Sequence, residues 1–301
     1  MRIATMQVFQ RGLDSMLDQQ SRVFKTQLQL ATGNKFTSPA DDPTAAAQIM
    51  GLNETIAITG QHQENITAAK ARLELEDTSL DSAVEVLQRA RELAVRGLND
   101  SLGVDGRRAV AQEIRQLMSE AMALANTQDG NGDYLFAGSR VQSAPFSHDG
   151  SGTFSYAGDQ DQRQLQISPG RQIADSDTGL DVFMKVADPA GGYKDIFTSL
   201  YDLATDLEAN APQLSSLGEI DAGMDHLLQV RARVGARLNT IDDQEGINSF
   251  LEIQLTSVRS TVQDVDIAET YSRLSQQMLV LQSAQQAFAQ VQGLSLFNYL
   301  R

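Results

Sequence analysis

LSQQMLVLQSAQQAFAQVQGLSLFNYL, residues 274–300, carries no charged side chain although it lies at the end of the chain. Seven glutamines interrupt this stretch, whereas a membrane span needs roughly 20 predominantly apolar residues, so we do not expect it to cross a membrane. Ordinary surface helices carry charges on their outer face. An uncharged helix with an apolar stripe is suited to burial among other helices, which indicates an assembly.

Both ends of the chain carry an apolar stripe at helical spacing. Apolar residues recur at steps of three and four over residues 3–31 and 267–291, which predicts two terminal helices. Packing of these stripes between copies, as coiled coils, is one interpretation, and closure of an intramolecular core is the other. The interface predicted by the first consists of Phe9, Leu13, Leu17, Phe24, Leu28, Ile267, Tyr271, Leu274, Met278, Leu281, Phe288, Val291, Leu296 and Phe297.

The distribution of charge favours packing between copies. Residues 1–42 hold five basic and four acidic residues, and residues 266–301 hold two of each, whereas residues 43–265 hold 17 basic and 33 acidic residues. Neutral ends can pack beside copies of themselves at little electrostatic cost. The acidic middle argues against nucleic-acid binding. Because their apolar faces lack partners in a monomer, we expect residues 1–42 and 266–301 to be poorly ordered there.

The pattern between the ends predicts a rod with an insert. Asp42 before Pro43 is a strong helix start, and the helix predicted over residues 43–98 has a weak point at Gly60. A second helix with apolar residues at heptad spacing indicates an antiparallel pair. Short alternating runs with turns predict a β-rich segment over residues 132–189.

A return helix starts with the capping-box signature Ser216-Leu-Gly-Glu219, and helix restarts at Asp264-Val265-Asp266. The predicted organisation is nested. Residues 1–42 with 266–301 form a terminal helical domain, residues 43–131 with 190–265 form the rod, and residues 132–189 form the outer β-rich domain. The fold class is therefore mainly α with a β-rich insert, in an elongated arrangement.

No constellation typical of catalysis is recognisable. The chain has no cysteine, and His62, His148 and His226 lack the spacing of metal ligands. Residues 129–133, DGNGD, suggest a calcium loop, but the later glutamate is missing and a turn is the better interpretation. We expect no enzyme, no cofactor and no metal.

Several motifs resemble the flagellins and flagellar hook-associated proteins. They are NKF and PADDP at residues 34–36 and 39–43, GDYLFAG at 132–138, VGARLN at 234–239, DVDIAE at 264–269 and SLFNYL at 295–300. The ending is unlike the leucine-rich tail of filament flagellins. The resemblance covers nearly the whole chain except about residues 147–190.

The resemblance implies a structural protein of the bacterial flagellum, involved in motility, that assembles as a ring at the hook–filament junction. The implied partners are further copies of itself, hook-associated protein 1, flagellin and an export chaperone. Secretion through the flagellar type III apparatus fits the absence of a recognisable signal peptide. Filament flagellin and a cytosolic coiled-coil module remain alternatives. The loop containing Gly33, Pro39, Asp41, Asp42 and Pro43 is expected to act as a hinge between terminal domain and rod.

Overall fold

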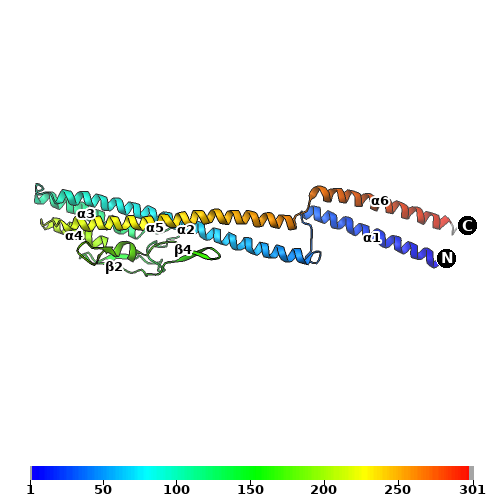
Figure 1. The fold of residues 1–301 in the computed structure, drawn as a ribbon, viewed down its shortest axis with the longest axis horizontal. Coiled ribbons are helices and arrows are strands. Elements are labelled where there is room, and N and C mark those ends of the chain that lie inside the picture. Colours follow the sequence, from blue (N-terminus) through cyan, green and yellow to red (C-terminus); the bar gives the residue numbers. More distant parts are fainter. Residues whose placement is uncertain (1, 298–301) are drawn as a thin grey trace. The chain divides into compact units, whose positions relative to one another are not determined.

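A computed structural model describes residues 2–297, with side chains for residue 7 and residues 9–290 (Figure 1). The chain divides into two compact units. One consists of Met1–Ile58 with Leu251–Arg301, and the other of Thr59–Phe250. Helices α2 (Pro43–Gly97) and α5 (Ser215–Gln263) contribute to both units. The three-part division expected from the sequence stays a prediction.

The first unit is built around helices α1 (Arg2–Thr32) and α6 (Ile267–Phe297), which run side by side in opposite directions (Figure 1). Local capping sets where its helices begin. Asp42 Oδ1 accepts hydrogen bonds from the N–H groups of Thr44 (3.1 Å) and Ala45 (2.9 Å), so α2 starts at Pro43 as predicted. Asp266 Oδ1 accepts from Glu269 N at 3.0 Å, which confirms the predicted helix restart.

The second unit packs the remaining parts of α2 and α5 with α3 (Val104–Ala125) and α4 (Ile196–Glu208). Helix α4 starts where Asp195 accepts a hydrogen bond from Thr198 N at 2.7 Å. Helix α2 continues through Gly60 without interruption. At the start of α5 the predicted capping box is wrong, because the helix already begins at Ser215. The Glu219 carboxylate lies 2.7 Å from Lys194 Nζ instead.

Between α3 and α4 the described residues contain three antiparallel strand pairs. They are β1 (Phe146–His148) with β2 (Phe154–Tyr156), β3 (Gln164–Ser168) with β4 (Arg171–Ala174), and β5 (Val186–Ala187) with β6 (Tyr193–Lys194). A π-helical turn, η1 (Leu180–Met184), precedes β5. The β-rich insert is therefore confirmed, although its strand pairs are not joined into one sheet.

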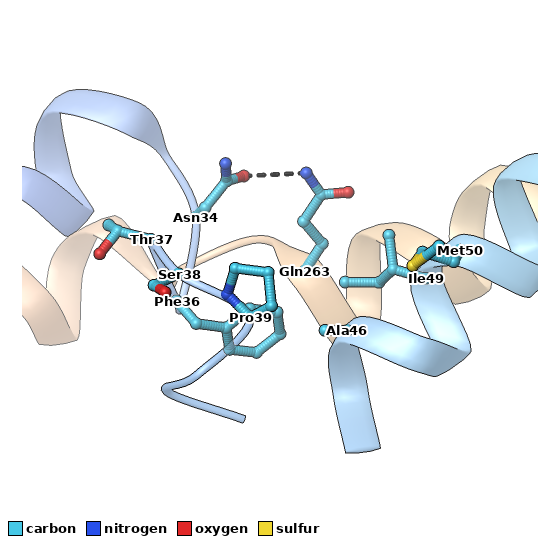
Figure 2. Close-up of a pocket in the computed structure, with 9 residues that line it drawn as sticks. All are labelled: Asn34, Phe36, Thr37, Ser38, Pro39, Ala46, Ile49, Met50 and Gln263. Atoms are coloured by element: carbon cyan, nitrogen blue, oxygen red, sulfur yellow. Dashed lines mark hydrogen bonds between the residues drawn. The ribbon is translucent and has the colours of Figure 1, made fainter. Parts of the chain in front are cut away.

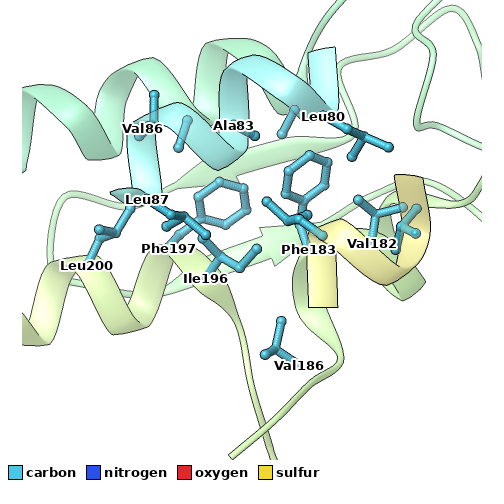
Figure 3. Packing of buried hydrophobic residues seen from close by; sticks show 14 of the residues in the cluster. Leu80, Ala83, Val86, Leu87, Val182, Phe183, Val186, Ile196, Phe197 and Leu200 are labelled. Carbon is cyan, nitrogen blue, oxygen red and sulfur yellow. The ribbon is translucent and has the colours of Figure 1, made fainter. Parts of the chain in front are cut away.

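One hydrophobic core serves both the helices and the insert of the second unit. Figure 3 shows Leu80, Ala83 and Leu87 of α2 packing towards Phe183 and Phe197. The Phe183 ring belongs to η1, and its centroid lies 5.1 Å from that of Phe136 in an edge-to-face arrangement. Because its large apolar side chains are buried against the helices, the insert shares their core.

Candidate assembly surface

Helices α1 and α6 contact one another through a seam of alternating three- and four-residue steps, which we call the inner seam. It combines apolar with small and polar side chains: Gly12, Met16, Gln19, Val23 and Thr26 from α1, and Thr270, Leu274, Gln277, Leu281, Ala284 and Phe288 from α6. Gln19 Nε2 donates to the main-chain oxygen of Gln277 at 3.2 Å. A Cβ on Gly12 would lie 3.4 Å from the Phe288 ring, which is ordinary van der Waals contact, so Gly12 packs directly beneath that ring.

A second apolar stripe on each helix is left partly exposed by the described residues. We call it the outer apolar surface, and it consists of Leu13, Leu17, Phe24 and Leu28 on α1 and Ile267, Tyr271 and Met278 on α6. Phe24 is 67% exposed, Ile267 67% and Tyr271 65%. Isolated exposed apolar residues are ordinary, but large residues repeated along two adjacent helices mark an interaction site.

An open hollow of about 580 Å³ lies where the two helices meet. It is lined by Val23, Ser275, Met278, Leu279, Leu281, Gln282 and Gln285. None of these side chains carries a charge, so an apolar side chain from another helix could enter the hollow without displacing an ion's hydration shell.

The structure divides the sequence-predicted interface between these two faces. Leu13, Leu17, Phe24, Leu28, Ile267, Tyr271 and Met278 are exposed, whereas Leu274, Leu281 and Phe288 lie in the inner seam. Phe9 takes part in both, because it is 40% exposed and contacts Phe288. Val291, Leu296 and Phe297 lie outside the residues whose side chains are described. Their role in assembly stays a prediction.

Two further exposed residues of α6, Leu279 and Val280, were missed by the sequence reasoning. They interrupt the heptad spacing, so a periodicity search assigns them to the polar side of the helix. The signal that could have identified them is the absence of charge around the whole helix after Arg273.

The α1–α2 loop and the α5–α6 turn are joined by a short antiparallel bridge between Asn34 and Asp264. Lys35 N donates to Gln263 O at 2.8 Å, and Val265 N donates to Gly33 O at 2.8 Å. Figure 2 shows the side-chain hydrogen bond from Gln263 Nε2 to Asn34 Oδ1, which is 3.1 Å long. The two connections are therefore held together on both their main chains and their side chains.

The predicted hinge residues stabilise this loop in a defined conformation. Gly33 has φ +72°, a left-handed conformation that suits glycine at the end of α1. The Asp41 carboxylate accepts from Thr37 N and Ser38 N, each at 3.3 Å. Its hydrogen bond with Lys25, at 2.6 Å, holds the pKa of Asp41 below its usual value. A hinge role for the loop stays a prediction.

The same loop covers one side of an apolar hollow of about 230 Å³ (Figure 2). Phe36 and Pro39 of the loop face Ala46, Ile49 and Met50 of α2 across it. The described helices include none with the length and apolar character of a membrane span. Within that part of the chain, no group of three or more His, Cys, Asp or Glu side chains is arranged to hold a metal ion.

Comparison with known proteins agrees with this architecture. The profile of the bacterial flagellin N-terminal helical region matches residues 3–141, and that of the C-terminal helical region matches residues 217–300. Flagellar hook-associated protein 3 of Escherichia coli is 30% identical over 99% of both chains. The protein of the same name from Salmonella typhimurium is 28% identical over 100% of both.

Solved structures show the same fold. A putative flagellar hook-associated protein from Vibrio parahaemolyticus superposes with a TM-score of 0.66 at 25% identity, covering 74% of this chain and 100% of that one. FlgL from Xanthomonas campestris gives 0.63 at 23% identity, covering 69% and 99%. With matching terminal helices and full-length relatives of one name, this chain belongs to the flagellin-like family of structural flagellar proteins that includes flagellar hook-associated protein 3.

Proposed function

We propose that this chain is a structural adaptor that assembles as a ring at the hook–filament junction and connects hook-associated protein 1 to the flagellin filament. The observation that carries the proposal is the outer apolar surface of α1 and α6, because the described residues leave it exposed. Complete burial of a side chain such as Phe24 or Ile267 between copies stabilises an assembly by at most about 1.5–3 kcal/mol.

The charge pattern supports contacts among identical chains. Helix α6 carries no charged residue between Leu274 and its end, and α1 carries six charges of both signs. Identical helices with little net charge can lie close together, since the repulsion between like charges is small. The acidic residues are concentrated in the middle of the chain, which keeps the free protein soluble.

Export through the flagellar type III apparatus belongs to the same proposal, as does a motility function outside the cell. A chaperone that covers the outer apolar surface before export is physically sensible, because exposed apolar patches favour aggregation. The proposed role is structural, and it requires no catalysis.

The experiment that tests the role is deletion of this chain in its own bacterium, followed by electron microscopy and a motility assay. Hooks without filaments, with flagellin released into the medium, are the expected result. Normal filaments would contradict a junction role. Growth of the purified chain alone into long filaments would favour the filament-flagellin alternative, and retention in the cytoplasm would favour an internal coiled-coil module.

A further inference from the structure

A group of charged side chains, most of them buried or partly buried, joins the β3–β4 hairpin to helices α2 and α5, and the Arg163 side chain at its edge is 45% exposed. We call it the charge cluster. It consists of Arg72 and Glu76 on α2, Asp129 after α3, Arg163 before β3, Asp175 and Asp177 after β4, and Arg237 on α5. Glu76 and Asp175 are fully buried, and Asp177 is 5% exposed. Charges this deep are costly unless they are paired.

Each aspartate of the cluster has an arginine partner. Arg72 Nη1 lies 2.5 Å from Asp129 Oδ2, and Arg72 Nε lies 3.3 Å from Asp175 Oδ2. Arg163 Nε donates to Asp175 Oδ2 at 2.7 Å. Arg237 forms an ion pair with Asp177, and its Nη1 also lies 3.5 Å from the main-chain oxygen of Ala174. These contacts connect the hairpin and the segment after it to both long helices.

Glu76 differs from these aspartates because no arginine among the described residues forms an ion pair with it. Its Oε1 and Oε2 accept only from the main-chain N–H of Asp177, at 3.1 and 3.3 Å. Asp175 Oδ1 is also buried without a hydrogen-bond donor. The neighbouring Asp77 and Asp81 lie at the surface of α2 and pair with Arg231 of α5, so they leave the balance of the cluster unchanged.

The charges in the cluster do not balance when every group is ionised. Its described members carry four carboxyl groups but only three guanidinium groups. One proton on Glu76 makes the cluster neutral, whereas its loss leaves one uncompensated negative charge in the interior. Burial, with a further contribution from the Asp177 carboxylate, raises the pKa of Glu76 to about 8.

We propose that Glu76 is the proton-binding residue of a latch that fastens the β3–β4 hairpin to α2 and α5, and that the latch loosens when this proton is lost. The hairpin is the element affected, because Asp175 directly follows β4 and Asp177 lies in the same short segment. The latch would tighten the insert in acidic surroundings and release it in alkaline ones. It operates independently of the flagellar role.

The direction of the pH effect follows from linkage. The pKa of Glu76 is near 8 in the folded protein, against an ordinary value of 4.5, so the folded form holds the proton more strongly than the opened form. The stabilising effect is complete below pH ~4.5 and is lost as pH rises to ~8. Within that window the equilibrium constant for opening should increase by up to about tenfold per pH unit.

The test is hydrogen exchange with mass spectrometry on the purified full chain between pH 5 and pH 9, with rates corrected for intrinsic exchange. In the wild type, the opening constant for peptides covering residues 164–178 should rise at least about tenfold between pH 6 and pH 8. Glu76→Gln keeps a neutral hydrogen-bonding side chain, and its opening constant should change little. Glu113→Gln, which alters an exposed carboxylate paired with Arg89, should behave like the wild type.

A second variant, Asp177→Asn, changes the charge of the cluster while leaving Glu76 in place. Asp177→Asn removes one negative charge, so three carboxylates would balance three arginines even with Glu76 ionised, while the Asn oxygen can still accept from Arg237. Its opening constant should depend on pH less than that of the wild type. The Asp177→Asn variant tests the latch independently if Glu76→Gln folds poorly. Parallel pH profiles in the wild type and in both cluster variants would overturn the latch.

Discussion

The rings of Phe9 and Phe288 lie with their centroids 4.9 Å apart and their planes tilted by 38°, joining α1 to α6. Phe288 of α6 is therefore packed against a residue of the same chain. Phe24, which lies on α1 like Phe9, is 67% exposed. Two apolar residues that look alike in the sequence have different surroundings. The distinction allows pairing within the chain to be tested separately from assembly between chains.

Replacing Phe24 with aspartate is expected to abolish incorporation into flagella. The carboxylate would remain in water in the free protein but would be buried in the assembly, where an unpaired charge is costly. Incorporation can be measured by complementing a deletion strain and counting filaments by microscopy. Circular dichroism and the unfolding of residues 59–250 should match the wild type.

Val95→Asp provides the matched control, because Val95 is 51% exposed on α2 in the second unit. It places the same charge at a position outside the outer apolar surface and should retain filaments. If Phe24→Asp still supports normal filaments, this surface is not the assembly interface. If it also unfolds the second unit, the effect is on folding and not on assembly.

Phe288→Ala should weaken the pairing of α1 with α6. Truncation of a buried phenylalanine costs about 3–5 kcal/mol, and the half-buried position of Phe288 reduces the expected cost to about 1–2 kcal/mol. The measurement is exchange of the α1 amides near Phe9, which should accelerate. Gln286→Ala, at an exposed position of the same helix, should have little effect. Equal exchange in both variants would show that the inner seam is not formed in solution.

In the free monomer, the amides of α1 and α6 are expected to exchange much faster than those of the second unit. Their inner seam contains Gly12, Thr26 and Thr270, so it buries less apolar area than the core around Leu80 and Phe183. Exchange measured at low protein concentration would check this. Protection of the terminal helices equal to that of the Leu80 region would contradict it.

The starts of α2 and α6 were predictable because they depend on groups a few residues apart. The Asp42–Pro43 start and the Asp266 cap need only a carboxylate and the N–H groups that follow it. Local groups do not show which face of α1 packs against α6, and this pairing was not predictable from the sequence. Each helix carries more than one apolar stripe, and periodicity does not identify which stripe meets the partner helix within the chain.

Glu76 illustrates a different limit. It lies in the heptad register of Leu73 and Leu80, where the sequence predicts an apolar residue, and this mismatch was the available signal. Its neighbours Asp177 and Arg237 are about 100 and 160 positions away in the chain. Their contact depends on how the insert docks, which no local pattern encodes. The π-helical turn η1 was missed for the same reason, because tertiary packing of Phe183 accompanies it.

Two glycines of α2 should respond in opposite ways to alanine. At Gly97 an added Cβ would meet Leu207 Cδ2 of α4 at 2.5 Å, so Gly97→Ala requires the fully buried Leu207 side chain to shift and should destabilise the second unit by about 1–3 kcal/mol. At Gly60 an added Cβ would meet nothing within 4 Å. Because alanine favours helix over glycine, Gly60→Ala should stabilise by about 0.5–1 kcal/mol. Urea unfolding monitored by circular dichroism measures both changes. Similar shifts for the two variants would mean that α2 and α4 do not approach closely at Gly97.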